Sequence, residues 1–128
     1  MPLKVNSTAP GIVVLEGTRA DFFSGNVSTQ DMNDEVRSIN GTASDALKAI
    51  ITKFNDRLIP FVGYALSGPD SSVNNYATAY PLTITNWPGG KAYPRRYTKL
   101  QFICAGKHDR MENWANCPIR IYCLNVGA

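Results

Sequence analysis

Apolar residues near the start of the chain form a short continuous run rather than an alternating pattern. The run Ile12–Leu15 is mostly β-branched and lies between Pro10 and Gly17, which is typical of a buried strand. The apolar pair within Leu3–Val5 is expected to join it at an edge. The sequence therefore predicts that the fold begins with paired strands.

The spacing of apolar residues then indicates a short helix. Ser28–Asp31 matches a capping box, the four-residue pattern that often opens a helix. Met32, Val36 and Ile39 follow at i, i+4 and i+7. This spacing predicts an amphipathic helix of about 11 residues that ends at Gly41.

A second helical period follows at once and is the clearest pattern in the chain. Residues 42–45 form another capping-box match. Apolar residues then share one helical face: Leu47, Ile50, Ile51, Phe54 and Leu58. The pattern predicts a helix of about 16 residues, which Pro60 ends because the residue before a proline is driven out of the helical conformation.

After Pro60 the apolar period becomes two, as in strands. Strands are predicted at 61–66, 73–84, 97–105 and 118–126. Pro81 lacks a backbone N–H, so the strand that contains it is expected to be an edge strand or a bulged one. Inward positions in the last two strands are predicted to be Leu100, Phe102, Cys104, Ile119, Ile121 and Cys123.

Helices are thus separated along the chain from strands that follow one another closely. This order predicts an α+β fold, a mostly antiparallel sheet with two consecutive short helices packed on one face. The 128 residues are expected to form a single domain, 1–128. No apolar run approaches the roughly 20 residues of a membrane-spanning helix, and the first eight residues lack the apolar segment of a signal peptide. We therefore expect neither a membrane protein nor a secreted precursor.

Charge is unevenly distributed between the two parts of the chain. Residues 1–86 hold six basic and eight acidic residues, a net charge of −2, whereas residues 87–128 hold seven basic and two acidic residues, a net charge of +5. The basic part can attract a polyanion or an acidic protein surface. The same charges are equally compatible with ordinary solvated loops and strands.

The three cysteines are expected to be reduced and buried, because an odd number without a signal peptide does not suggest a disulfide framework. A zinc site at Cys104, His108, Cys117 and Cys123 is a weaker alternative. These four residues supply suitable ligands, but they lack the close pairs usual in structural zinc sites. The sequence therefore predicts no metal and no cofactor.

Candidate chemistry for catalysis is sparse. His108 is the single histidine, and no serine elbow or cysteine signature accompanies it. Glycine-rich segments do not lead into a helix as phosphate-binding loops do. We expect the protein not to be an enzyme.

The segment from Lys91 to Lys99 interleaves aromatic and basic side chains. Its candidate binding residues are Tyr93, Arg95, Arg96, Tyr97 and Lys99. Tyrosine and arginine are enriched at protein interfaces. Rings and cations also serve single-stranded nucleic acid through stacking and phosphate contacts. Both interpretations stay open, as does a solvated loop.

These observations favour a non-enzymatic structural or assembly protein that acts through protein–protein contacts. Our most specific hypothesis is a bacteriophage virion component: a capsid decoration or cement subunit, or a small head or tail protein. It would form a homo-oligomer, contact a larger assembly such as a capsid lattice, and be located in the virion after assembly in the host cytoplasm.

The alternative hypothesis is a small binding module, located in the cytoplasm. It would bind carbohydrate through Trp87, Trp114 and the tyrosines, or single-stranded nucleic acid through the Lys91–Lys99 segment.

Overall fold

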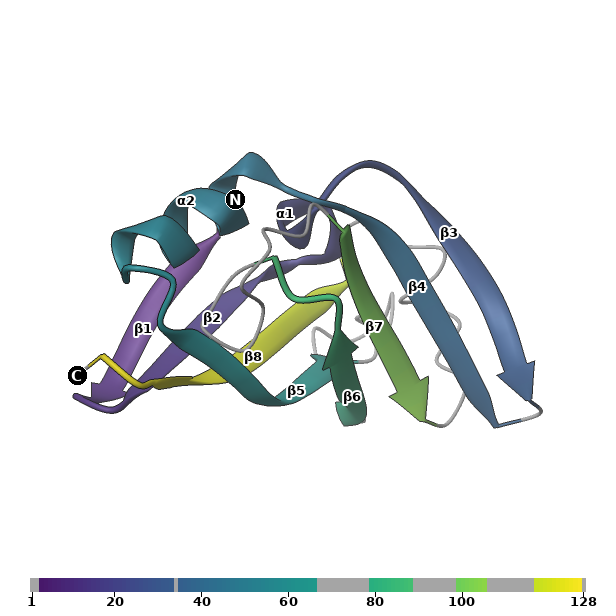
Figure 1. The fold of residues 1–128 in the computed structure, drawn as a ribbon. Helices are drawn as coiled ribbons and strands as arrows, with labels where there is room; N and C mark the ends of the chain where they lie inside the picture. Colours follow the sequence, from purple (N-terminus) through teal and green to yellow (C-terminus); the bar gives the residue numbers. More distant parts are fainter. Residues whose placement is uncertain (1–2, 34, 67–78, 89–98, 106–116, 128) are drawn as a thin grey trace, which may run out of the picture.

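The computed structural model describes residues 3–33, 35–66, 79–88, 99–105 and 117–127. Within these residues eight strands form one sheet, each neighbouring pair is antiparallel, and two helices accompany it (Figure 1). The elements are β1 (Lys4–Ala9), β2 (Ile12–Thr18), α1 (Arg19–Phe22), β3 (Phe23–Asn33), β4 (Val36–Ala43), α2 (Asp45–Lys53), β5 (Leu58–Leu66), β6 (Ala79–Thr85), β7 (Lys99–Ala105) and β8 (Pro118–Asn125). The prediction of a mostly antiparallel sheet with helices is confirmed.

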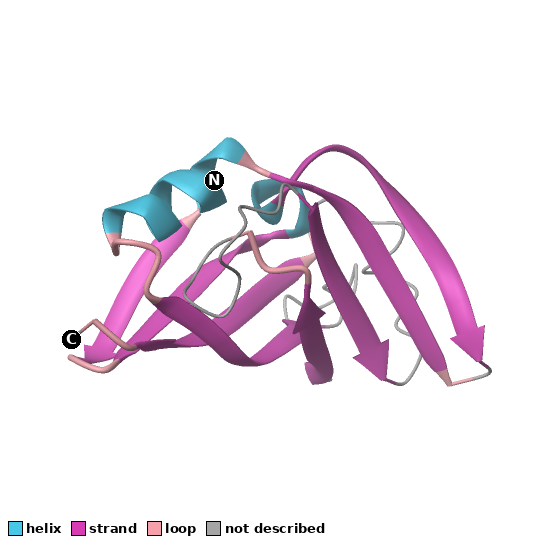
Figure 2. Cartoon of the chain, in the orientation of Figure 1, coloured by secondary structure: helices cyan, strands magenta, loops and turns pink. Residues whose placement is uncertain are grey.

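The sheet order is β1-β2-β8-β5-β6-β7-β4-β3, so β1 and β3 are the edge strands of the described sheet. Both helices lie on the same side of the curved sheet (Figure 2). Phe22 of α1 and Leu47 and Ile51 of α2 belong to one buried cluster with inward side chains of the strands. We call the side of the sheet that faces this cluster the inner face, and the opposite side the outer face.

Aromatic contacts join the two halves of the sheet through the inner face. The Phe102 ring on β7 lies 5.7 Å from the Phe22 ring and 5.2 Å from the Phe23 ring, both at 75°. Such edge-to-face pairs stabilise a core beyond the area that they bury. They hold α1 and the start of β3, which follow β2 in the chain, against β7.

The alternation predicted for the last strands is confirmed. Every residue predicted to face inward on β7 and β8 is buried, and the core also includes Val13 and Leu15 on β2. A two-residue period fixes which side chains share a face. It therefore also fixes which residues of β8 and β2 remain for the outer face.

The first predicted helix is wrong. Residues 28–33 belong to β3 and residues 36–39 to β4, and these two strands pair as antiparallel neighbours. Across this pair the Arg37 Nε lies 2.7 Å from the Asp31 Oδ1, and β4 is also paired with β7. The helices are consequently not consecutive, because β3 and β4 separate them.

The second predicted helix is present but shorter. The Ser44 hydroxyl accepts a hydrogen bond from the Leu47 N–H at 3.1 Å, so Ser44 is the N-cap. The helix ends at Lys53 because Asn55 and Asp56 adopt left-handed backbone conformations, with φ of 58° and 57°. Leu58, predicted on the helix face, instead begins β5.

The expectation that Pro81 marks an edge strand is wrong, because β6 lies between β5 and β7. Pro81 is paired with Tyr64 on β5, but the ladder with β7 begins one residue later, at Leu82. On the β7 side, the missing N–H of Pro81 therefore lies outside the ladder. Leu82 belongs to the core cluster, and Ile84 packs against it.

Candidate interaction surface

Three rows of side chains cross the outer face of β2, β8 and β5. Directly paired residues of neighbouring strands project to the same side of a sheet. The rows are Glu16–Arg120–Tyr64, Val14–Tyr122–Val62 and Ile12–Leu124–Ile59. We call the surface made by these rows and Phe61 the outer patch. All of the residues in the last two rows except Tyr122 are aliphatic.

A register irregularity in β5 adds a further ring to the outer patch. The pairing of β5 with β8 shifts between Pro60 and Val62, which leaves Phe61 as the extra residue of a bulge. The Phe61 ring lies 6.4 Å from the Tyr122 ring, at a tilt of 53°. Phe61 is 51% exposed, so half of this ring faces solvent.

Large apolar side chains elsewhere in the patch are also exposed. Tyr64 is 37% exposed and Leu124 42%. Val14, by contrast, is buried but does not belong to the core cluster. The outer patch thus has a covered aliphatic base beneath exposed rings and a leucine.

One ion pair lies on the patch. The Arg120 Nε is 3.4 Å from the Glu16 Oε1, and the side chains are 48% and 28% exposed. Exposed ion pairs contribute little to stability because solvent screens both charges. The pair leaves both charged groups accessible to a partner.

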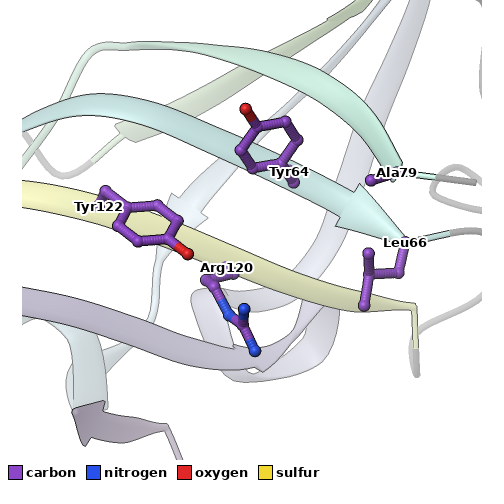
Figure 3. Close-up of a pocket in the computed structure, with 5 residues that line it drawn as sticks. All are labelled: Tyr64, Leu66, Ala79, Arg120 and Tyr122. Carbon is purple, nitrogen blue, oxygen red and sulfur yellow. The ribbon is translucent and has the colours of Figure 1, made fainter.

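Arg120 also separates two shallow hollows of the patch. The larger, of about 240 Å³, is lined by Tyr64, Leu66, Ala79, Arg120 and Tyr122. The smaller, of about 150 Å³, is lined by Glu16, Gly17, Leu66, Pro118, Ile119 and Arg120. Figure 3 shows Tyr122 and Arg120 projecting from β8 beside Tyr64 of the adjacent strand β5. Rings and a guanidinium therefore meet at one place on the sheet.

The outer face has a different character on β6, β7 and β4. Its residues there include Thr83, Thr85, Gln101, Ser38 and Asn40. The Thr85 hydroxyl donates a hydrogen bond to the Gln101 Oε1 at 2.7 Å. These five side chains are polar and uncharged; Ile103 and the exposed Lys99 share the face, but none of the described outer-face residues of β6, β7 and β4 has an aromatic ring.

The cysteines do not form a reactive site in the described part of the chain. Cys104, Cys117 and Cys123 are buried and form no disulfide bond, as predicted. Burial raises the pKa of the Cys123 thiol to about 12, which keeps it protonated and disfavours its action as a nucleophile near neutral pH. Among the described residues, no three His, Cys, Asp or Glu side chains group to hold a metal ion. His108, the fourth residue of the zinc alternative, lies outside these residues.

Most of the binding residues predicted from the sequence are also outside the described ranges. Tyr93, Arg95, Arg96 and Tyr97 fall there, while Lys99 is exposed at the start of β7. The nucleic-acid hypothesis for this segment stays a prediction. Trp114 is likewise outside the described ranges.

The expectation that Trp87 forms part of a carbohydrate platform is wrong. Trp87 is fully buried and belongs to the core cluster. Its indole Nε1 has no hydrogen-bond partner among the residues that the structure describes. A buried ring cannot stack on a sugar in solution, so any platform has to use other rings.

The outer patch itself was not identified from the sequence, although the sequence carries a signal of it. Inward positions on β8 were assigned by alternation, and the alternate positions Tyr122 and Leu124 are also apolar. The continuous apolar run of β2 likewise supplies both faces. Strands with apolar residues on both faces indicate a sheet with both faces covered.

Comparison with known proteins does not identify a relative: no protein-family model, curated protein or solved structure matches the chain. Neither helix in the described ranges is long and apolar enough to cross a membrane. The outer patch is therefore the feature of the described chain that bears on its function.

Proposed function

We propose that this protein is a non-enzymatic assembly subunit, an α+β domain whose helices pack on the inner face and whose outer patch binds protein. The observation that carries the proposal is the concentration of exposed Phe61, Tyr64 and Leu124 around Arg120. Contiguous exposed apolar surface marks interaction sites. Aromatic residues and arginine contribute most to the affinity of such sites.

The more specific form of this proposal is a bacteriophage virion component: a decoration or cement subunit of the capsid, or a small head or tail protein. The chain is short and carries no motif that names a reaction, and its described residues present the exposed outer patch, which supports a role in protein–protein contact. Such a subunit would associate with its own copies and with a larger protein lattice.

The experiment that tests assembly is the native mass of the purified protein, measured by light scattering over a wide range of protein concentration. We expect a mass above that of one 14.0 kDa chain. The double variant Phe61→Ser/Tyr64→Ser should reduce this mass towards one chain. Met32→Ser is the matched control, since Met32 is 52% exposed but lies on β3, away from the patch. A mass of one chain at every concentration contradicts self-assembly.

A second candidate function is carbohydrate binding, favoured by the larger hollow. Tyr64 and Tyr122 offer rings for stacking, and Arg120 offers hydrogen-bond donors beside them. Calorimetric titration with a panel of neutral and acidic oligosaccharides tests it. Saturable binding that Tyr64→Ala abolishes supports this function, and the absence of binding across the panel contradicts it.

A further inference from the structure

The outer patch carries complementary side chains on either side of the boundary between β2 and β8. In each row, one residue lies on β2 and its partner on β8: Glu16 with Arg120, Val14 with Tyr122, and Ile12 with Leu124. The first row combines opposite charges and the other two combine apolar groups. A surface arranged in this way is complementary to a second copy of itself.

We infer that the partner of the outer patch is a second copy of this chain, related by a two-fold axis that runs along the strands between β2 and β8. This inference rests on the proposed assembly function and specifies its geometry. In a two-fold interface the same patch serves both copies, and each contact occurs twice. The rotation places β2 of each copy over β8 of the other, with every row at its own level.

The contacts that follow from this rotation are matched in chemistry. Glu16 faces Arg120 of the second copy, and Ile12 faces the exposed Leu124 of the second copy. One strand further out, β1 lies over β5 of the second copy. Lys4, which is paired with Glu16, then faces Tyr64, which is paired with Arg120. A lysine over a tyrosine ring makes a favourable cation–π contact.

The charges gain from the dimer because Glu16 and Arg120 are already neighbours within one chain. Across the axis, the two pairs form a ring of four charges of alternating sign. Each carboxylate then has two cations nearby in a less hydrated environment, where the attraction is less screened. Like charges in this place would oppose association strongly.

The patch is large enough for a weak specific dimer. Four strands spaced about 4.8 Å apart and about 24 Å long present a flat area of about 450 Å² per copy. The two copies together would bury about twice this area, which is near the lower end of the areas buried in specific interfaces. We therefore expect the dimer to dissociate on dilution.

Association through the face is favoured over association through the sheet edges. The pairing of β1 with β2 is irregular between Ser7 and Ala9. The pairing of β3 with β4 is irregular between Ser24 and Ser28 and again near Asn33, and Gly25 has a φ of 72°. Irregularities of this kind disturb the straight edge that another strand needs for pairing.

A mixing experiment with two charge-reversal variants tests the geometry. In the row of the outer patch that holds Glu16 and Arg120, the variant Glu16→Arg has two arginines and the variant Arg120→Glu has two glutamates. Each variant alone sets like charges opposite each other in the proposed dimer, so we expect its dissociation constant to rise at least about tenfold. In a mixed dimer, by contrast, each Arg faces a Glu of the other chain, so equimolar mixing should restore association.

This design separates contacts between chains from contacts within a chain, because neither variant can form the Glu16–Arg120 pair in its own chain, even after mixing. Sedimentation equilibrium measures association, and native mass spectrometry identifies the mixed dimer by mass. Thermal unfolding checks that each variant is folded. Lys53→Glu is the control, because it changes the net charge by the same amount as Arg120→Glu but at an exposed position on α2.

The outcomes distinguish the inference from the proposed function. Weak association of each variant with recovery on mixing supports the two-fold geometry. If the wild type associates and both variants associate equally well, or if mixing does not restore association, this geometry is overturned while assembly stands. A wild type that remains at the mass of one chain at all concentrations overturns both.

Discussion

Leu124→Ser removes an exposed leucine from the outer patch and separates its contribution to association from its contribution to folding. In the monomer 42% of this residue is accessible, and the remainder is covered by neighbours. In the proposed dimer the accessible part is buried against Ile12 of the second copy. The substitution therefore affects two equilibria by amounts that the exposed fraction determines.

The magnitudes follow from the cost of exposing a leucine. Complete burial of a leucine side chain contributes about 1.5–3 kcal/mol. Covering the accessible 42% in a dimer then contributes about 0.6–1.3 kcal/mol per copy. Because both copies lose it, the dissociation constant should rise by about 8- to 80-fold. Loss of the part that is already buried should lower the free energy of unfolding of the monomer by about 1–2 kcal/mol.

Sedimentation equilibrium gives the dissociation constant, and urea unfolding at low protein concentration gives the free energy of unfolding of the monomer. Met32→Ser, which removes an exposed side chain of β3, should leave the dissociation constant unchanged. If Leu124→Ser destabilises the monomer as expected but changes the dissociation constant by less than about twofold, burial of Leu124 in the dimer is contradicted. Leu124 would then be covered by nothing in the dimer.

Three further predictions concern the fold that supports the patch. Ser44→Ala should lower the free energy of unfolding by about 1–2 kcal/mol in urea titrations, because the hydroxyl caps α2 and donates to the Asp21 carbonyl at 2.6 Å. An unchanged free energy of unfolding would show that the cap is dispensable. Gly63→Ala should lower the free energy of unfolding by about 1–3 kcal/mol, since a Cβ there would lie 2.7 Å from the Ile121 Cδ1. Gly11→Ala is the control and should leave stability unchanged, because its Cβ meets no atom within 4 Å. Equal melting temperatures for the two variants would contradict this prediction. Burial raises the pKa of the Cys123 thiol from 9.0 to about 12, so the folded chain keeps a proton that the unfolded chain loses above about pH 9. The free energy of unfolding should therefore fall by about 1.4 kcal/mol per pH unit from about pH 9 to 12, and Cys123→Ala should lack this slope.

The strands at the end of the chain were predictable because one local pattern determines them. In β7 and β8, the residues predicted to face inward recur at every second position, although the neighbouring Ile103, Tyr122 and Leu124 are also apolar. Alternation of this length has no helical interpretation. The inward side chains could accordingly be named from the sequence.

The β3–β4 hairpin was not predictable from local pattern because its stability comes from distant pairing. Met32, Val36 and Ile39 satisfy a helical period with only three positions, a small number that a strand pair also allows. What decides the outcome is the position of β4 between β3 and β7, although β7 begins 66 residues after the end of β3. Tertiary pairing overrides weak local preference in such segments.

The outer patch could be deduced only in part, for a related reason. Sequence alternation shows that Tyr122 and Leu124 lie opposite the inward residues of β8, but it does not show which strands flank β8. The neighbour β2 lies near the start of the chain and β5 near its middle, and their pairing with β8 brings Glu16 and Tyr64 to either side of Arg120. Lys99, the predicted binding residue that the structure describes, lies on β7, which β5 and β6 separate from β8.

The composition of β2 connects this fold to assembly. Ile12–Leu15 is apolar on both faces of its strand: Val13 and Leu15 pack in the core, and Val14 is buried on the outer face. In sheets whose strands are apolar on both faces, a second layer covers each side. Here α1 and α2 both contribute to the inner core, and neither described helix lies on the outer face. Phe61, Tyr64 and Leu124 nevertheless remain exposed on this face of the single chain, and in the proposed dimer a second copy placed on the outer patch covers them.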